Sequence, residues 1–204
     1  MDIKTLQVGP IGTNCYLLCD QSEALCAVID PGGDAQRVAA AVKASGCAPC
    51  VILLTHGHYD HTGAVSELSA MWPGVPVYLN QRDQQGDDAY LRQLFPPVPV
   101  SKDYGEGDTI RVGSLAVKVL ATPGHSEGSV TLRCGDALFC GDTLFAGSCG
   151  RTDFPGGSVK KMMASLKRLG ELEGDFTVYP GHMESSTLSR ERARNPYLRQ
   201  AMNG

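Results

Sequence analysis

The sequence predicts an α+β fold with two β-rich halves, each of which has helices to cover its sheet. Two patterns support this prediction. Short apolar runs with a period of two are typical of strands, and apolar residues three or four positions apart are typical of helices. No linker or change of composition divides the 204 residues. We therefore expect one domain over residues 1–204, because this length suits one large hydrophobic core.

The first half is expected to begin with strands and to continue with two helices. Three short strands are expected at residues 3–8, 14–19 and 24–30. A helix is expected over residues 34–46, with Asp34 as its N-cap and Gly46 as the glycine that ends it. A buried strand at residues 50–55 then leads towards a second helix at residues 62–72.

The middle of the chain and the second half continue this pattern. After a strand at residues 75–79, a polar helical stretch is expected up to Phe95, and the proline-rich residues 96–100 are expected to form an extended connector. Four more strands are expected at residues 109–112, 115–122, 129–134 and 137–142. The remaining predicted elements are a helix at 158–169, a strand at 176–182 and a last helix at 187–194.

The charge and hydropathy of the chain argue against several classes of partner. Eighteen basic and 22 acidic residues give a formal net charge of −4, and the basic residues form no block, so we expect neither nucleic acid nor a membrane as a partner. No apolar run approaches the ~20 residues of a membrane span, and the N-terminal segment does not resemble a signal peptide. We expect a cytoplasmic protein that acts on a small molecule.

The eight cysteines do not have the spacing of a metal cluster. Five of them lie in apolar or strand-like stretches, where a free cysteine behaves as a small hydrophobic residue. Cys47 and Cys50 form a single C-x-x-C motif, with no second pair to complete a four-cysteine site. We expect reduced thiols, with a redox or metal role for Cys47 and Cys50 as the alternative.

The segment LLTHGHYDH, at residues 53–61, holds three of the five histidines of the chain together with Asp60. Neutral imidazole and carboxylate groups suit zinc, iron or manganese as ligands. In a loop, His56 and His58 can point the same way and chelate one ion. Asp60 and His61, at the entrance of the next helix, can face a second ion.

The other histidines and one aspartate occur in the same local setting. His125, Asp142 and His182 each follow a predicted strand, next to glycine or proline, and strand ends at one edge of a sheet converge in space. The candidate metal ligands are therefore His56, His58, Asp60, His61, His125, Asp142 and His182. Seven ligands are too many for one tetrahedral ion but suit two ions with a shared ligand. Asp30 either orients a ligand histidine or forms the turn before Pro31.

Several motifs resemble those of a known family. THGHYDHTG, TPGHSEGSV, GDTLF and YPGH resemble the metallo-β-lactamase superfamily. Within it, PIGTNCYLL, IDPGG, GSCGRTDFPGGS and NPYL resemble the glyoxalase II group, the hydroxyacylglutathione hydrolases and their short bacterial relatives. The resemblance implies a four-layer αββα sandwich of the metallo-β-lactamase type, with a binuclear site at one edge. It also implies that one metal is held by His56, His58 and His125, the other by Asp60, His61 and His182, with Asp142 as the bridge.

This constellation predicts a metal-dependent hydrolase. Two divalent ions lower the pKa of a bridging water from ~15.7 toward ~7, so that hydroxide can attack an acyl carbonyl at neutral pH. We expect zinc, with iron or manganese as alternatives, and Asp60 as the catalytic proton acceptor. The resemblance to glyoxalase II implies a thioester substrate such as S-lactoylglutathione.

Outside the metal site, one side chain is expected to bind the substrate. Arg151, in GRTDF, is expected to contact an anionic group of the substrate at the pocket mouth; the alternative is a solvated surface arginine. Full-length glyoxalase II members hold the glutathione carboxylates with a C-terminal helical region. Few residues follow His182, so we expect that region to be largely absent and the pocket to be open.

Other functions of related chemistry stay open. Persulfide dioxygenases, which bind one iron through two histidines and an aspartate, also resemble the chain in GRTDF. Another hydrolase of the superfamily, a lactonase or a lactamase, is a further alternative; lactamases of the superfamily lack the bridging aspartate that Asp142 provides. A metal-stabilised binding protein would have a coordinatively closed site instead.

Overall fold

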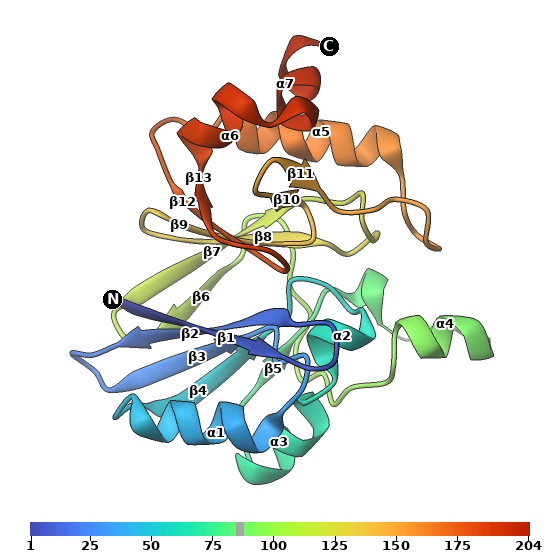
Figure 1. Ribbon diagram of the computed structural model, residues 1–204. Coiled ribbons are helices and arrows are strands. Elements are labelled where there is room, and N and C mark those ends of the chain that lie inside the picture. Colours follow the sequence, from blue (N-terminus) through green and yellow to red (C-terminus); the bar gives the residue numbers. More distant parts are fainter. Residues whose placement is uncertain (85–87) are drawn as a thin grey trace.

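The computed structural model describes residues 1–84 and 88–204, and it shows two β-sheets packed face to face between helices. In Figure 1, helices α1 (Ala35–Ala44) and α3 (Val65–Met71) lie under the first sheet. Helices α5 (Val159–Gly170), α6 (Leu188–Arg194) and α7 (Pro196–Asn203) lie over the second sheet. The predicted four-layer αββα sandwich is therefore confirmed.

The first sheet has five strands in the order β1-β2-β3-β4-β5. These strands are β1 (Asp2–Val8), β2 (Thr13–Asp20), β3 (Leu25–Ile29), β4 (Ala48–Leu53) and β5 (Val77–Tyr78). The first three are antiparallel, and β3, β4 and β5 are parallel because helices connect them. All of β2 is buried. Its side chains alternate between two cores: Leu17 packs among residues of α1 and α3, and Leu18 packs towards the second sheet.

The second sheet has six strands in the order β13-β12-β9-β8-β7-β6. These strands are β6 (Thr109–Val112), β7 (Leu115–Ala121), β8 (Val130–Cys134), β9 (Ala137–Gly141), β12 (Thr177–Pro180) and β13 (Ser186–Thr187). Only the β9–β12 pair is parallel among these neighbours. A small hairpin of β10 (Leu144–Phe145) and β11 (Ser148–Cys149) follows β9.

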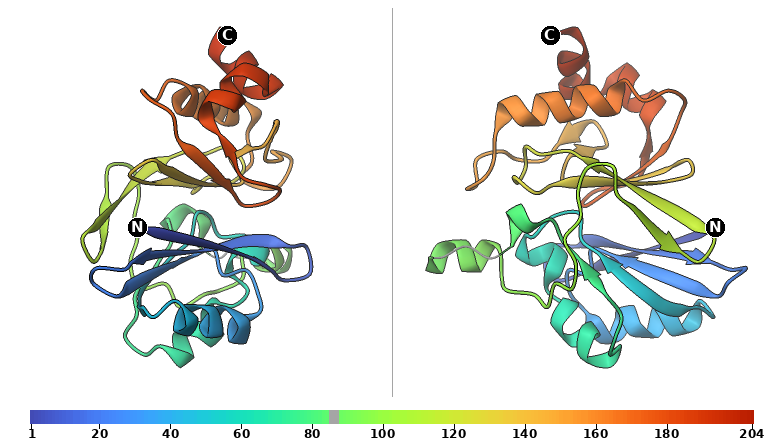
Figure 2. Two further views of the ribbon diagram at one scale, coloured as in Figure 1. Left: turned by 60° about the vertical axis from the view of Figure 1, so that its left-hand side comes forward. Right: turned by 180° about the vertical axis from the view of Figure 1, so that it is seen from behind.

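Three aromatic rings pack together within the mostly aliphatic core between the sheets. The Phe139 and Tyr179 rings stack with their centroids 5.2 Å apart, and the Tyr16 ring of the first sheet packs 5.3 Å from Phe139. The Tyr16 hydroxyl also donates a hydrogen bond to the carbonyl of Pro180, at 2.6 Å. The views in Figure 2 show the two sheets facing each other across this core. The hydrogen bond between Tyr16 and Pro180 therefore joins the first sheet to the second at the end of β12.

Some predicted elements differ from those observed. The predicted helix at residues 62–72 corresponds to α3, and a separate short helix, α2 (Tyr59–Thr62), precedes it. The helical stretch before Phe95 consists of a 3₁₀ turn, η1 (Gln81–Asp83), and α4 (Ala89–Leu94), while residues 85–87 of that prediction lie outside the described residues. The predicted last helix, α6, is followed by α7.

The predicted cap of α1 is wrong in its chemistry. Asp34 does occupy the N-cap position, but its side chain makes no capping hydrogen bond. Its carboxylate instead accepts a hydrogen bond from the Gly9 backbone N–H, at 3.0 Å. Asp34 therefore ties the β1–β2 turn to the start of α1. Across the described residues, no helix has the length and apolar character needed to cross a membrane.

Candidate metal centre

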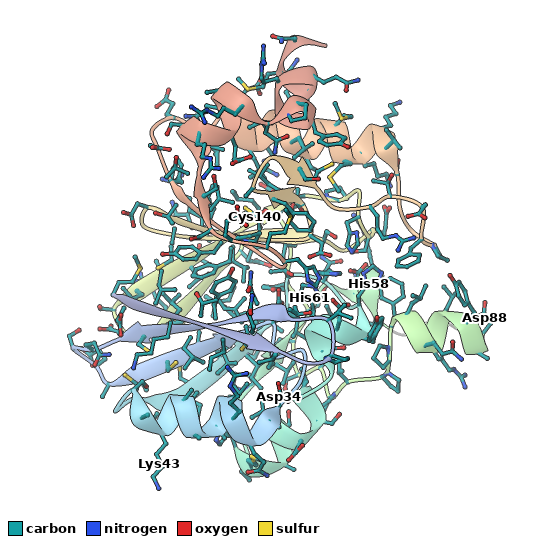
Figure 3. All side chains as sticks on the ribbon, in the orientation of Figure 1. Asp34, Lys43, His58, His61, Asp88 and Cys140 are labelled. Atoms are coloured by element: carbon teal, nitrogen blue, oxygen red, sulfur yellow. The ribbon has the colours of Figure 1, made fainter. Side chains whose placement is uncertain are left out.

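The candidate metal ligands lie at one edge of the sandwich, where strand ends of both sheets meet. The histidine cluster follows β4 of the first sheet. The other three candidates, His125, Asp142 and His182, follow β7, β9 and β12 of the second sheet. The sequence predicted convergence at the edge of one sheet; the structure shows that two sheets contribute. Figure 3 shows His58 and His61 in the region between them.

All seven predicted metal ligands come together. Their ligand atoms form three overlapping sets, and within each set the atoms lie within 4.8 Å of one another. The sets are His56, His58 and His125; His56, His61 and Asp142; and Asp60, His61 and His182. The first and the third sets are the two groups of ligands that the resemblance implied.

Asp142 lies between these two groups. Its Oδ2 atom is 3.4 Å from Nε2 of His125 and 3.6 Å from Nε2 of His182. Its Oδ1 atom is 3.3 Å from Nε2 of His61. One carboxylate therefore reaches members of both groups, which is the position that a bridging ligand needs.

The hydrogen bonding of the cluster fits bound cations. Nε2 of His56, Nε2 of His61 and Oδ1 of Asp142 are buried and have no hydrogen-bond partner among the described residues. A buried polar atom without a partner costs about 1–3 kcal/mol. Nitrogen and carboxylate donors suit zinc, iron and manganese. Metal ions at this position would satisfy the unpaired atoms.

Side chains and backbone groups around the cluster fix the orientation of the imidazoles. Asp30 Oδ2 lies 3.0 Å from Nδ1 of His61. The Thr55 hydroxyl lies 3.1 Å from Nδ1 of His56, and the Arg151 carbonyl oxygen lies 2.8 Å from Nδ1 of His125. In each ring the bonded nitrogen is Nδ1, so Nε2 is left to face the centre of the cluster.

Asp83 was not predicted, and it joins the two loops that carry the first group of histidines. Its buried carboxylate accepts hydrogen bonds from the Gly57 N–H at 3.1 Å, the Gly128 N–H at 2.6 Å and the Ser126 hydroxyl at 2.5 Å. Gly57 separates His56 from His58, and a Cβ atom at either glycine would collide with Asp83. Nothing in the sequence marks this aspartate, because its partners are distant along the chain.

The electrostatics favour the ligand forms of His56, His58, Asp60 and Asp142, and the protonated form of His61. Burial, aided by the neighbouring imidazoles, lowers the pKa of His56 well below its ordinary value and that of His58 to about 3. Burial alone would raise the pKa of Asp60 and Asp142, but the adjacent histidines outweigh it and hold both below the ordinary value. Burial alone would also lower the pKa of His61, but Asp142 and Asp30 raise it.

A cavity of about 340 Å³ opens onto this cluster. Arg151, the predicted anion contact, lines it. The guanidinium of Arg151 is exposed and forms two hydrogen bonds of 2.7 Å to the carboxylate of Asp153, and it lies 3.8 Å from the centroid of the Phe154 ring. The side chain is thus at the predicted place, but its charge is already paired within the protein.

The thiols of the C-x-x-C motif lie away from this cavity. Burial raises the pKa of both Cys47 and Cys50. In the first sheet, the sulfur atoms of Cys19 and Cys26 lie 3.3 Å apart on neighbouring strands. A raised pKa leaves a thiol in its weakly nucleophilic form. Cys47 is buried in the core between the first sheet and its helices, and Cys50 packs against the core between the sheets, so both pack as small hydrophobic groups.

Comparison with known sequences identifies relatives over most of the chain. A model of the metallo-β-lactamase superfamily matches residues 8–182. An uncharacterized protein of Aquifex aeolicus is 39% identical over the full length of both chains. The hydroxyacylglutathione hydrolase GloC of Haemophilus influenzae is 31% identical, with 97% of this chain and 98% of that protein covered. A hydroxyacylglutathione hydrolase of Alkalilimnicola ehrlichii is 43% identical, with 82% of this chain and 60% of that protein covered.

Two solved structures are similar over nearly their whole length. BLEG-1, described as a B3 metallo-β-lactamase, superposes with a TM-score of 0.87 at 32% identity, with 97% of this chain and 99% of that chain covered. TTHA1623 in a di-iron-bound form superposes with a TM-score of 0.82 at 38% identity, with 95% and 99% covered. One of these structures is thus described as a lactamase, and the other is described with two bound iron ions.

Proposed function

Since the chain belongs to the metallo-β-lactamase superfamily and is a metal-dependent hydrolase of that superfamily, we propose that it cleaves thioesters such as S-lactoylglutathione. The observation that carries this proposal is the position of Asp142 between two groups of ligands at the floor of a cavity. The names of two relatives, both hydroxyacylglutathione hydrolases, support the thioester as substrate.

The proposed ligands form two groups with one shared member. One divalent ion would be held by His56, His58 and His125, and the other by Asp60, His61 and His182. Asp142 would reach both ions. When bound, two such ions would lower the pKa of a coordinated water and polarise the acyl carbonyl. We propose zinc, with iron as the alternative that the di-iron-bound TTHA1623 supports.

Asp60 is the proposed proton acceptor. Its Oδ2 atom accepts a hydrogen bond from the Thr13 hydroxyl at 3.1 Å and lies 3.1 Å from Nε2 of His182. The pKa of Asp60 is below its ordinary value, so the carboxylate is ionised at neutral pH and is available to accept a hydrogen bond from a metal-bound water. The side chain also lines the cavity, where a substrate would bind.

Metal analysis combined with a substrate panel tests the proposal. We expect about two ions per chain, hydrolysis of S-lactoylglutathione, and loss of that activity with a chelator. One iron per chain together with oxygen consumption on glutathione persulfide would indicate a persulfide dioxygenase instead. A cephalosporin belongs in the panel because BLEG-1, at 32% identity, is described as a lactamase. Faster turnover of the cephalosporin than of any thioester would contradict the proposal.

A further inference from the structure

The cavity above the candidate metal ligands has mainly apolar walls. The apolar and aromatic side chains that line it are Ile11, Tyr59, Leu94, Phe145, Phe154 and Met183. Three of these, Ile11, Tyr59 and Met183, are among the exposed large hydrophobic residues of the protein. Exposed apolar groups gathered at one cavity are typical of a binding surface for an apolar ligand.

Apart from the proposed metal ions, the described residues that line the same cavity offer an anionic ligand no unpaired Lys or Arg. Asp60 and Asp142 belong to the proposed metal centre. Arg151 is the one cationic Lys or Arg among the described residues that line the cavity, and Asp153 pairs with its guanidinium through two hydrogen bonds. A carboxylate of a substrate would meet a guanidinium whose charge Asp153 already offsets and whose Nε and Nη2 donors are occupied, so it would gain less from Arg151 than from an unpaired arginine.

Met183 is held in the cavity wall at the expense of backbone strain. Its φ angle is 70°, in the left-handed region that favours glycine. The Asn14 side chain, which is buried, donates a hydrogen bond of 2.8 Å to the Met183 carbonyl and fixes this conformation. A residue other than glycine here costs stability, but it places an apolar side chain beside His182.

From these three observations we infer that the cavity selects thioesters whose acyl and thiol parts are uncharged and apolar near the metals. This inference rests on the proposed function and names its substrate class. Glutathione conjugates, which carry two carboxylates, are then hydrolysed with a higher KM than neutral thioesters, and an apolar acyl chain is the group that the wall recognises. Ile11 and Met183 would determine this specificity, and Asp153 would keep Arg151 from attracting anions.

Binding of two thioethers, which cannot be hydrolysed, tests the inference independently of the reaction. S-hexylglutathione and S-hexyl-N-acetylcysteamine share an apolar chain and differ in the charge of the thiol part. For the metal-loaded protein, calorimetry should give a Kd about tenfold lower for the neutral thioether, the effect of one charged group left without a partner. Equal or tighter binding of S-hexylglutathione would overturn the inference.

Cavity variants locate the recognition of the apolar chain. Ile11→Ala and Met183→Gly should each weaken binding of the neutral thioether several-fold, and Met183→Gly should not lower the Tm because glycine adopts the observed φ without strain. Val159→Ala, which removes the same kind of exposed side chain outside the cavity, is the matched control. If Ile11→Ala and Met183→Gly bind the neutral thioether as the control does, the apolar wall is not the recognition surface.

A charge variant tests the role given to Asp153. Asp153→Ala should free the guanidinium of Arg151 and lower the Kd for S-hexylglutathione about tenfold, while the neutral thioether binds as before. An unchanged Kd for S-hexylglutathione would contradict this role of Asp153.

Hydrolysis assays separate the inference from the proposed function. On thioesters of N-acetylcysteamine, kcat/KM should rise about fourfold for each methylene of the acyl chain that becomes buried. Binding of the neutral thioether without hydrolysis of any thioester would support the inference and contradict the proposed function. Hydrolysis with a clear preference for glutathione thioesters would support the proposed function and contradict the inference.

Discussion

Asp30 Oδ2 lies 3.0 Å from Nδ1 of His61, and both side chains are buried. The same carboxylate accepts hydrogen bonds from the backbone N–H and the hydroxyl of Thr55, at 2.7 and 2.6 Å. Asp30 also has a φ of 51°, and its carbonyl accepts a hydrogen bond of 2.8 Å from the Gly32 N–H, so it begins a tight turn after β3 as well. The two roles that the sequence left open for Asp30 are therefore both present in the structure, and the first of them connects Asp30 to the candidate metal centre.

We predict that Asp30→Asn lowers metal affinity about 10- to 100-fold, because an amide no longer fixes the His61 ring with a charged acceptor. Titration with a competing chelator would measure the loss. Asp34→Asn, in the same loop, removes a carboxylate that bonds Gly9 and not a histidine, and it should keep wild-type metal affinity. Equal losses in both variants would indicate a general effect of the loop.

Asp142→Ala should lose most of the second metal ion and nearly all hydrolysis. The reason is its proposed bridging position, within 3.6 Å of histidines from both groups. Metal content by elemental analysis and turnover of a thioester are the two measurements. Cys50→Ala, a substitution away from the cavity, should leave both unchanged. Two ions and normal turnover in Asp142→Ala would refute the binuclear assignment.

The structure brings together the candidate ligands that the sequence singled out, and much of the signal that singled them out is local. The spacing of His56, His58 and His61 after a buried strand indicates a metal loop without any knowledge of tertiary structure. Helix α7 also has a local signal, an asparagine followed by a proline: the Asn195 side chain accepts hydrogen bonds from the Tyr197 and Leu198 N–H groups, and Pro196 is the first helical residue.

Other features could not have been predicted, because they depend on contacts between distant segments. The hydrogen bonds of Asp83 join residues 26 and 45 positions away, and the Arg151 carbonyl is 26 positions from His125. The pairing of Arg151 with Asp153 is close in sequence, but the GRTDF motif does not reveal whether the arginine faces a substrate or its neighbour. Only the three-dimensional positions distinguish these cases.

A pH dependence of stability is predicted for Asp20, which links the two sheets. Its carboxylate accepts hydrogen bonds from Ser22 and from Ser114, in the turn between β6 and β7. These bonds lower the pKa of Asp20 below its ordinary value of 3.8. Their contribution is thus fully present above about pH 4 and is lost as the pH falls through the lowered pKa.

Asp20→Asn should therefore melt at a lower temperature than wild type at pH 6, and the difference in Tm should shrink as the pH is lowered below 4. Thermal unfolding followed by circular dichroism over this range measures both. Glu23→Gln, at an exposed neighbouring position, provides the control. A Tm difference that stays constant down to pH 2.5 would show that the charge of Asp20 does not contribute.

The last prediction concerns Asp83, the positioning residue of the first histidine group. Asp83→Ala leaves the buried Gly57 and Gly128 N–H groups without their acceptor, which should cost at least about 2 kcal/mol of unfolding free energy. Because these groups flank His58 and His125, metal affinity should fall as well. Urea denaturation of the metal-free protein measures the unfolding free energy, and chelator competition measures the metal affinity. Asp103→Ala, which removes an exposed acceptor of the Gln81 N–H in the same region, should change neither by a comparable amount. If Asp83→Ala lost stability but bound metal as wild type does, Asp83 would be a structural residue only, and the two loops would hold the histidines without it.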